Sequence, residues 1–331
     1  MATLKDVAKL ANVDVSTVSR ALNNTSYVHP DTKAKIYAAV KKLSYQPNLL
    51  AKGLRQGKRH TIGVIIPSIN LTIFGEITQS IEFHCRNLGY ETLICNTDDN
   101  PITEEECLSR LRSGFIDGII IASTGQNQRL LRDINASGIP VVQIIRKHDK
   151  MLNSVVANYY TCGYDGVCFL HQKGCEHIGF IKGSMEILPL KERYDGYRKA
   201  IKKLKLSENI LSLEHRRLTP FETGYEMTHA LLDQNPNLDG LIVEVDMQGL
   251  GAIRALKERN ILISKQVKLL SLTGHSIGGM LETSMTSMEM PASDIGKSAT
   301  QLLIDLIKTS TTKSNAQHIV FEPSLVERET T

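Results

Sequence analysis

The sequence of 331 residues lacks several features that are typical of membrane and secreted proteins. No apolar run approaches the roughly 18–20 residues that a membrane-spanning helix needs. The N-terminus, MATLKD, lacks the basic and then apolar layout of a signal peptide. The six cysteines form no CxxC pair, so we expect reduced thiols and not a disulfide framework. These absences predict a protein that stays in the cytoplasm and does not contact the membrane.

One group of possible metal ligands needs to be weighed. Cys168, His171, Cys175 and His177 lie within ten residues of one another. The segment has the pattern of a helix end, a Lys-Gly stop and the start of a strand, and ligands spread over that geometry do not converge easily on one ion. We therefore predict ordinary packing at this group, and no metal and no cofactor for the chain.

Acidic residues are scarce in the first 60 residues, which hold 11 Lys and Arg, three Asp and no Glu, a net charge of +8. The remaining 271 residues hold 28 Lys and Arg against 32 Asp and Glu, a net charge of −4. A basic head on a mildly acidic body is typical of a protein whose head binds a polyanion. A solvated lysine-rich surface gives the same balance, so charge alone leaves both interpretations open.

The apolar residues of the head follow a helical period. They predict an amphipathic helix over residues 4–11. Asn12 follows in a turn that suits a left-handed residue, and Asp14 is a good N-cap for a second helix over residues 15–22. A third helix is predicted from about residue 31 to residue 43, with Ile36, Val40 and Leu43 buried. A helix, a tight turn and a polar second helix form the layout that places a recognition helix in the major groove.

Three stretches of the head carry a more specific pattern: residues 3–11 (TLKDVAKLA), 15–23 (VSTVSRALN) and 43–48 (LSYQPN). They resemble the head of the lactose-repressor (LacI/GalR) family of transcription regulators, and the match is nearly continuous over the first 60 residues. The resemblance implies that the head binds double-stranded DNA.

The resemblance also implies which residues contact DNA. In the family, the start of the second helix and its arginine read base edges, and these positions are Val15, Ser16 and Arg20. Arg20 can bond guanine bidentately, Ser16 is permissive, and Val15 can offer only an apolar contact. The residues expected to contact phosphates or to support the fold are Thr3, Thr17, Ser19, Asn23 and Tyr45. For Thr17 and Ser19, simple solubility of the helix is the alternative.

Residues 48–55 (NLLAKGLR) resemble the family's hinge helix, which orders only on DNA and lies in the minor groove. Gly53 costs roughly 1 kcal/mol of helix propensity, so we expect this hinge to depend strongly on DNA and on dimer contacts. A merely basic linker is the alternative, but it leaves the leucines unexplained. The expected DNA contacts are Asn48, Ala51, Lys52 and Leu54, with Leu54 as the apolar wedge between base pairs.

From residue 61 the pattern changes to apolar strands that alternate with amphipathic helices, which is the βαβ signature of covered parallel sheets. A first set of strands is predicted at residues 62–67, 91–95, 118–122, 141–145 and 154–157. A second set is predicted at residues 177–182, 241–245, 268–272 and 286–290. Two sheets imply two α/β subdomains with a ligand cleft between them.

The family resemblance covers this part more weakly, through residues 95–99 (CNTDD), 116–120 (IDGII) and 192–197 (ERYDGY). It implies a periplasmic-binding-protein-like core of two parallel-sheet subdomains. The expected domains are a helix-turn-helix head over 1–46, a hinge helix and linker over 47–60, and an effector-binding and dimerisation core over 61–331. Within the core, we expect an N-subdomain over about 61–160 and 291–322, and a C-subdomain over about 161–290 and 323–331.

The effector site implied by the resemblance departs from the family pattern at several positions. Where the family usually has Asp, this chain has Ser68, Ala157 and Thr273. Arg146 and Arg193 remain, and fewer anions with two cations favour a sugar phosphate or a sugar acid as the effector. The residues expected to bind the effector are Ser68, Asn70, Phe74, Arg146, Asn158, Arg193, Asp246, Thr273 and His275.

The expected function is a repressor that binds a near-palindromic operator as a homodimer. No leucine heptad follows the apparent last strand, so we expect dimers and not tetramers. A carbohydrate-type effector in the cleft is expected to change the spacing of the two hinges and so the affinity for DNA. Induction and corepression both stay open.

Two other classes of function compete with this interpretation. Residues 274–278 (GHSIG) match the G-x-S-x-G nucleophile elbow of α/β-hydrolases. Only His318 follows as a base, the candidate acids Asp294 and Asp305 are expected in the other subdomain, and a hydrolase gives no reason for the head, so we predict no enzyme. A protein-only adaptor that a phosphocarrier protein controls is the third class, and nothing in the sequence selects it.

Overall fold

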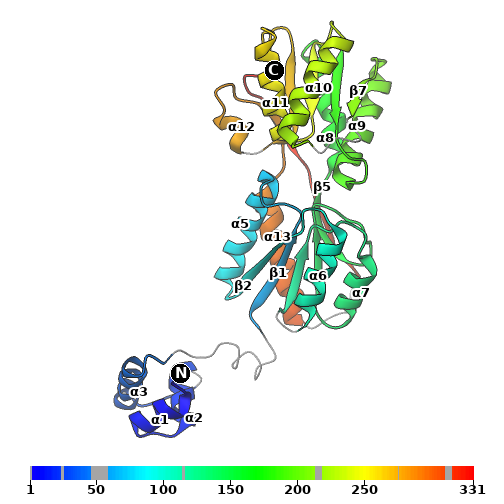
Figure 1. Cartoon of the computed structure of the whole chain (residues 1–331). Coiled ribbons are helices and arrows are strands. Elements are labelled where there is room, and N and C mark those ends of the chain that lie inside the picture. The colour runs from blue at the N-terminus through cyan, green and yellow to red at the C-terminus, as the bar shows by residue number, and fades with distance from the viewer. Residues whose placement is uncertain are drawn as a thin grey trace. The chain divides into compact units, whose positions relative to one another are not determined.

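The computed structural model describes residues 2–23, 26–45, 59–113, 116–212, 218–274, 276–309 and 315–331. The chain divides into two compact units, Met1–Arg59 and His60–Thr331 (Figure 1). The expected hinge contacts Asn48, Ala51, Lys52 and Leu54, and the expected effector residue His275, lie outside the described residues.

The N-terminal unit consists of three helices, α1 (Leu4–Ala11), α2 (Val15–Asn23) and α3 (Pro30–Lys42). A capping box starts α1, because the Thr3 hydroxyl accepts from the Asp6 backbone while the Asp6 carboxylate accepts from the Thr3 backbone. Asn12 ends α1 in the left-handed region, with φ 51° and ψ 49°. The Asp14 carboxylate accepts from the Ser16 backbone at 2.7 Å, which confirms its predicted capping of α2.

The core of this unit is small. Val7, Val18 and Ile36 are fully buried in it. Val40 and Leu43, which the sequence predicted to be buried, are only half buried and pack against its edge. A unit of this size has too much surface for its volume to enclose every apolar residue of α3.

The second unit begins with a parallel sheet in the order β11-β5-β4-β3-β1-β2. Its strands are β1 (Thr61–Ile66), β2 (Glu91–Asn96), β3 (Gly118–Ile121), β4 (Val141–Ile144), β5 (Asn153–Ala157) and β11 (His318–Phe321). The helices that accompany this first sheet are α5 (Thr72–Asn87), α6 (Pro101–Arg112), α7 (Gln128–Ala136) and α13 (Ala292–Thr309). Buried Ile and Val side chains of the strands form its core.

A second sheet follows in the order β12-β10-β9-β8-β6-β7, in which only β12 runs antiparallel to its neighbour. Its strands are β6 (Ile178–Lys182), β7 (Asn209–Ser212), β8 (Gly240–Val243), β9 (Lys268–Gly274), β10 (Thr286–Glu289) and β12 (Ser324–Val326). Its helices are α8 (Tyr159–Gln172), α9 (Leu188–Leu204), α10 (Pro220–Gln234), α11 (Asp246–Glu258) and α12 (Ser276–Met280).

The two sheets confirm the predicted class of fold and the nine predicted strands. The edge strands β7, β11 and β12 lie outside the nine predicted segments, because their described residues are only half buried or exposed, which weakens the apolar signal. Figure 1 shows the carboxyl ends of the strands of both sheets pointing toward the junction between them. None of the helices within the described ranges is long and apolar enough to cross a membrane.

Two crossings of the chain between the sheets lie side by side. Asn158, which follows β5, donates from its backbone to the Phe321 carbonyl at 2.9 Å and from its side-chain amide to the Glu322 carboxylate at 3.1 Å. Its side-chain oxygen caps α8 by accepting from the Thr161 backbone at 3.1 Å. Asn158 therefore has a structural role at this junction, and its expected role in effector binding stays a prediction.

Helices α8 and α9 pack with their backbones in contact. A Cβ added to Gly163 meets the Arg193 carbonyl oxygen at 1.9 Å, and one added to Gly196 meets the Tyr160 carbonyl oxygen at 2.1 Å. Only glycine fits at both positions. This close packing brings Arg193 beside the start of α8.

Candidate DNA-binding and effector sites

The outer face of α2 presents two of the three predicted base-reading residues. Ser16 and Arg20 are exposed and lie one helical turn apart. Val15 is half buried and packs against the core of the N-terminal unit. Ser16 and Arg20 are therefore the side chains that this helix can offer most freely to a base edge.

The other predicted contacts of the head have partners within the head. The Asn23 amide donates to the Ser19 carbonyl at 2.8 Å, which holds both residues at the end of α2. Thr3 belongs to the capping box of α1, and Tyr45 packs against the core. Thr17 is half buried. These contacts fit residues that support the fold, and they leave their contacts to DNA a prediction.

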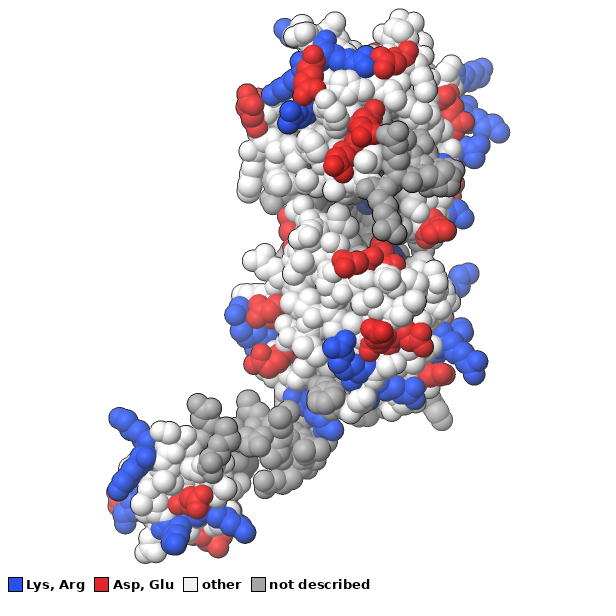
Figure 2. All heavy atoms as spheres, viewed as in Figure 1, with Lys and Arg blue, Asp and Glu red and all other residues white. Residues whose placement is uncertain are grey.

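Basic side chains lie over the surface of the N-terminal unit, with a few acidic groups among them (Figure 2). Arg20 is exposed on α2. Cations on such a surface are suited to bind phosphates.

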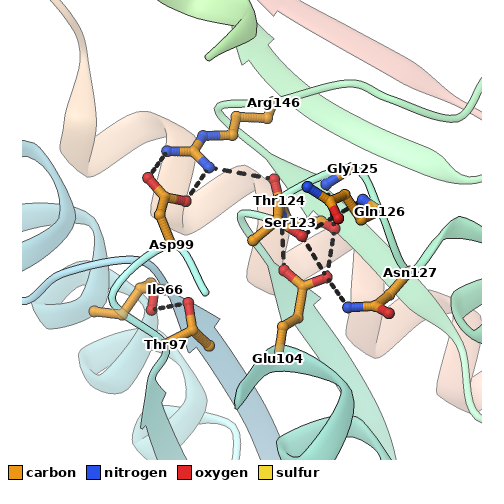
Figure 3. A network of polar contacts seen from close by, with 10 residues as sticks. All are labelled: Ile66, Thr97, Asp99, Glu104, Ser123, Thr124, Gly125, Gln126, Asn127 and Arg146. Atoms are coloured by element: carbon orange, nitrogen blue, oxygen red, sulfur yellow. Dashed lines mark hydrogen bonds and ion pairs between the residues drawn. The ribbon is translucent and has the colours of Figure 1, made fainter. Parts of the chain in front are cut away.

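An ion pair occupies the carboxyl edge of the first sheet. Arg146 follows β4, and its Nη1 and Nη2 donate to the two carboxylate oxygens of Asp99 at 2.5 and 2.8 Å (Figure 3). Its Nη1 also lies 3.4 Å from the Ser123 carbonyl oxygen. Arg146 is 6% exposed and Asp99 35%. One of the two cations expected at the effector site is thus already neutralised by a carboxylate that the sequence analysis did not select.

A buried carboxylate shapes the loop that follows β3. Glu104 on α6 is fully buried, and its oxygens accept from the hydroxyls of Ser123 and Thr124, the Thr124 backbone and the Asn127 amide at 2.7 to 3.2 Å (Figure 3). Four donors satisfy the charge. Glu104 was not predicted from the sequence either; its signal was an acid at a buried position of a helix.

A polar cluster lies at the carboxyl edge of the second sheet. Glu244 follows β8, and its backbone carbonyl accepts from the Thr273 hydroxyl at 2.7 Å and from Arg193 Nη1 at 3.3 Å. The Arg193 guanidinium carbon lies 4.9 Å from the ring centre of Tyr159. Asp246, at the start of α11, accepts from the Ser271 hydroxyl at 2.6 Å. The structure therefore brings Arg193, Asp246 and Thr273 together, as the sequence predicted, and adds Glu244 and Tyr159.

Glu244 has an unusual protonation equilibrium. Burial raises its pKa from the ordinary 4.5 to about 8, against the opposing effects of the Arg193 charge, a hydrogen bond from the Gly183 backbone and the Lys182 charge. The carboxyl group is therefore mostly neutral at pH 7. Its sequence signal was a single acid at the end of the apolar run LIVEV.

The remaining predicted effector residues have different settings. Ser68 and Asn70 follow β1, where Ser68 is half buried and Asn70 exposed. Phe74 is 4% exposed and belongs to the apolar core beneath α5. Since Phe74 makes its described contacts inside the core, its expected role at the site stays a prediction.

The alternative hydrolase pattern does not assemble within the described residues. His318 lies on β11 of the first sheet, and its Nδ1 is 2.9 Å from the Ser154 hydroxyl. Ser276 begins α12, which accompanies the second sheet, and Asp294 and Asp305 lie on α13. The base thus has a structural partner that is not the nucleophile.

The weighed metal ligands have partners of their own. His171 Nδ1 lies 3.1 Å from the Cys175 carbonyl oxygen, and the Cys175 thiol donates to the Asp239 carbonyl at 3.3 Å. Among the residues that the structure describes, no group of three or more possible ligands converges.

A helical head that can read DNA, joined to two parallel sheets with polar strand ends, defines a ligand-responsive DNA-binding protein. Comparison with known proteins agrees. The model of bacterial regulatory proteins of the lacI family matches residues 3–48, and the model of periplasmic binding proteins and the sugar binding domain of the LacI family matches residues 59–323. The chain belongs to the LacI family of transcription regulators.

Individual relatives match over the whole chain. The HTH-type transcriptional regulator RegA of Clostridium saccharobutylicum is 32% identical, covering 100% of both chains. The ribose operon repressor of Halalkalibacterium halodurans is 29% identical, covering 100% of this chain and 97% of the relative. The crystal structure of the lac repressor dimer bound to operator and the anti-inducer ONPF has the same fold, with a TM-score of 0.87, 22% identity, and coverage of 99% and 98%.

Family membership establishes the general function. The protein is a DNA-binding transcriptional repressor that an effector regulates, and it is not an enzyme. As a bacterial transcription regulator it acts in the cytoplasm, where the chromosome lies. These findings confirm the predicted family, class of function and location.

Proposed function

We propose that the protein binds a near-palindromic operator as a homodimer, and that a carbohydrate-type effector at the strand ends of its two sheets controls this binding. The observation that carries the proposal is the polar cluster of Arg193, Glu244 and Asp246 in a chain whose head exposes Ser16 and Arg20. The name of a full-length relative, a ribose operon repressor, supports a sugar-type effector.

On the DNA side, Arg20 reads a guanine edge and Ser16 tolerates more than one base. Lys and Arg side chains of the head bind phosphates and set the register. The hinge residues Asn48, Ala51, Lys52 and Leu54 follow the head into the minor groove, where Leu54 separates a base step.

An apolar edge of the first sheet supports the homodimer. Strand β2 is the outermost strand, and its Leu93 and Ile94 are more than 40% exposed. Phe83 of α5, the helix that leads into β2, is about half exposed. Exposed apolar side chains that gather on one edge are typical of a protein–protein contact. A homodimer supplies two heads, one for each half of a near-palindromic operator.

On the effector side, the charges favour a sugar acid or a sugar phosphate. Asp99 neutralises Arg146, but no described Asp or Glu forms an ion pair with the buried Arg193. A buried cation without a counter-charge is costly, so an anionic group of the ligand stabilises it. Asp246, which accepts from the Ser271 hydroxyl, is the carboxylate expected to accept hydrogen bonds from ligand hydroxyls as well.

The regulation is a shift of population between conformations of the core that hold the two hinges at different spacings. An effector that prefers the conformation with poorly spaced hinges releases the operator, and one that prefers the other conformation strengthens binding.

The test combines DNA and ligand binding by the full chain. Operator sequences are selected from random DNA, and their affinity is measured by fluorescence anisotropy with and without sugars, sugar acids and sugar phosphates. The proposal expects a dyad-symmetric sequence whose affinity changes at least tenfold with one member of the panel. A site without symmetry, or an affinity that a pull-down partner from cell extract controls in place of any sugar, contradicts it.

A further inference from the structure

We propose that Glu244 is a specificity-determining residue of the effector site, where its neutral carboxyl group donates a hydrogen bond beside Arg193 and so selects an oxyanion of the ligand. The inference rests on the proposed effector site and adds a residue and a proton to it. The oxyanion can belong to a sugar acid or to a sugar phosphate.

The hydrogen bonds of Glu244 place the acid proton. Glu244 is 1% exposed, and its Oε2 accepts from the Gly183 backbone at 2.6 Å. Its Oε1 is buried and has no partner among the described residues. Because Oε2 already accepts, the proton of the neutral acid belongs on Oε1, which is then a buried donor without an acceptor.

Two more donors in the same cluster lack acceptors. Arg193 Nε is buried without a partner, and so is the Tyr159 hydroxyl. Arg193 contacts both neighbours, since its Nη1 donates to the Glu244 carbonyl at 3.3 Å and its guanidinium carbon lies 4.9 Å from the centre of the Tyr159 ring. Buried polar groups are normally paired, so three unpaired groups in one cluster indicate a missing ligand group.

The unpaired groups indicate which chemical group of the ligand belongs in this cluster. All three unpaired groups can donate: the Glu244 acid, Arg193 Nε and the Tyr159 hydroxyl. A carboxylate or phosphate offers several lone pairs and no proton, and its charge compensates that of Arg193. A ligand hydroxyl has two lone pairs and brings a proton that needs an acceptor of its own. The cluster therefore fits an oxyanion better than a neutral hydroxyl.

The protonation of Glu244 makes this recognition depend on pH. The charged groups that act on Glu244 are Arg193 on α9 and Lys182 on β6. Tyr159 and Cys162 on α8 lie against Arg193, and Asp246, which begins α11, follows Glu244 by two residues. Burial outweighs the two cations and raises the pKa of Glu244 to about 8. Below that pH the acid donates to the ligand, and above it the carboxylate repels an anion.

The test measures binding by calorimetry with the full chain at pH 6.5 and pH 9. The probes are ribose, ribonate and ribose 5-phosphate, and glucose, gluconate and glucose 6-phosphate. The expected result is that, among the three ribose probes or the three glucose probes, the acid or the phosphate binds more tightly than the neutral sugar. The affinity for a sugar acid falls about tenfold at pH 9, where about one Glu244 in ten keeps its proton if its pKa is about 8. A sugar acid ionises near pH 4, so its own charge does not change over this range.

The variant Glu244→Gln keeps the shape of the side chain and removes its titration. Glutamine keeps an acceptor for Gly183 and a permanent donor, so the affinity for the sugar acid stays within threefold between the two pH values. Glu186→Gln removes the same charge from an exposed side chain in the loop between β6 and α9 and keeps the tenfold fall. If Glu244→Gln does not fold, the affinity of the unaltered protein for the sugar acid at pH 6.5 and pH 9 still tests the proposal.

Each other outcome has a distinct meaning. A neutral sugar that binds more tightly than its acid and phosphate at both pH values overturns the inference but leaves the proposed function in place. An acid that binds equally well at pH 6.5 and pH 9 also overturns it, since Glu244 then does not donate. If no probe binds or alters operator binding, the proposed carbohydrate-type effector fails, and this inference fails with it.

Discussion

Replacing Glu244 by glutamine is expected to stabilise the core of the protein at alkaline pH. Glu244 is buried at the end of β8, and its pKa is raised to about 8 from the ordinary 4.5. Ionising this group in the folded chain takes a charge out of water, and the charges of Arg193 and Lys182 offset only part of the cost. Glutamine has nearly the same shape and no charge, so the variant avoids that cost.

The magnitude and the sign follow from the two pKa values. Between pH 4.5 and about 8 the folded chain holds a proton on Glu244 that the unfolded chain has released, so the stability of the unaltered protein falls as the pH rises. A difference from 4.5 to about 8 corresponds to about 5 kcal/mol at most, at 1.36 kcal/mol per tenfold change. Most of this loss occurs between pH 5 and pH 8, and none of it occurs in the variant.

The assay is urea unfolding followed by far-ultraviolet circular dichroism at pH 5, 6, 7, 8 and 9. The expected free-energy advantage of Glu244→Gln over the unaltered protein grows with pH and reaches up to about 4 kcal/mol between pH 5 and pH 9. Histidines and other titrating groups are common to both proteins and cancel in this difference. Glu186→Gln, which changes an exposed carboxylate, serves as the control and shows no such growth. Parallel stability curves for the Glu244 variant and the unaltered protein would show that Glu244 does not hold a proton in the folded chain above pH 5.

Three further predictions concern DNA binding, the first sheet and assembly. Arg20→Ala weakens binding to the cognate operator by roughly 1–3 kcal/mol and relaxes specificity at one base position. If fluorescence anisotropy shows an unchanged preference for the operator over a scrambled site, Arg20 does not have this role. Glu104→Ala leaves the donors of Ser123, Thr124 and Asn127 without their acceptor. Urea unfolding should show a free energy of unfolding that is lower by roughly 1–3 kcal/mol or more, and an unchanged midpoint speaks against a stabilising role of this network. Phe83→Glu places a charge on the apolar edge beside β2, so sedimentation should show more monomer than for the unaltered protein, and an equal dimer fraction excludes this edge as the interface.

Much of the fold could be predicted because local sequence determines it. The left-handed Asn12 and the capping Asp14 follow from the preferences of single residues, and both are confirmed. Apolar runs such as residues 118–122 mark buried parallel strands, because both faces of such strands are covered. The short edge strand β7 carries no comparable run.

The effector site was harder to predict because distant residues determine its chemistry. Arg146 was recognised as a cation, but its neutralisation depends on Asp99, which lies 47 positions away in the chain. Phe74 was expected at the effector site, yet its burial in the core depends on how α5 packs on the sheet. Glu244 was missed because its raised pKa arises from complete burial in the packed chain, which periodicity does not reveal. Patterns identify the faces of elements, and only the packed chain shows which side chains meet.

The central claim is that one chain reads a two-fold operator and that a small carbohydrate-type ligand changes this binding. The most direct measurement is the footprint of the full chain on its selected DNA, titrated with and without the sugar acid or sugar phosphate that binds most tightly. Two protected half-sites about one helical turn apart are expected, and the ligand should shift their occupancy at least tenfold. A single unsymmetrical footprint, or a symmetrical one that no such ligand alters, contradicts it.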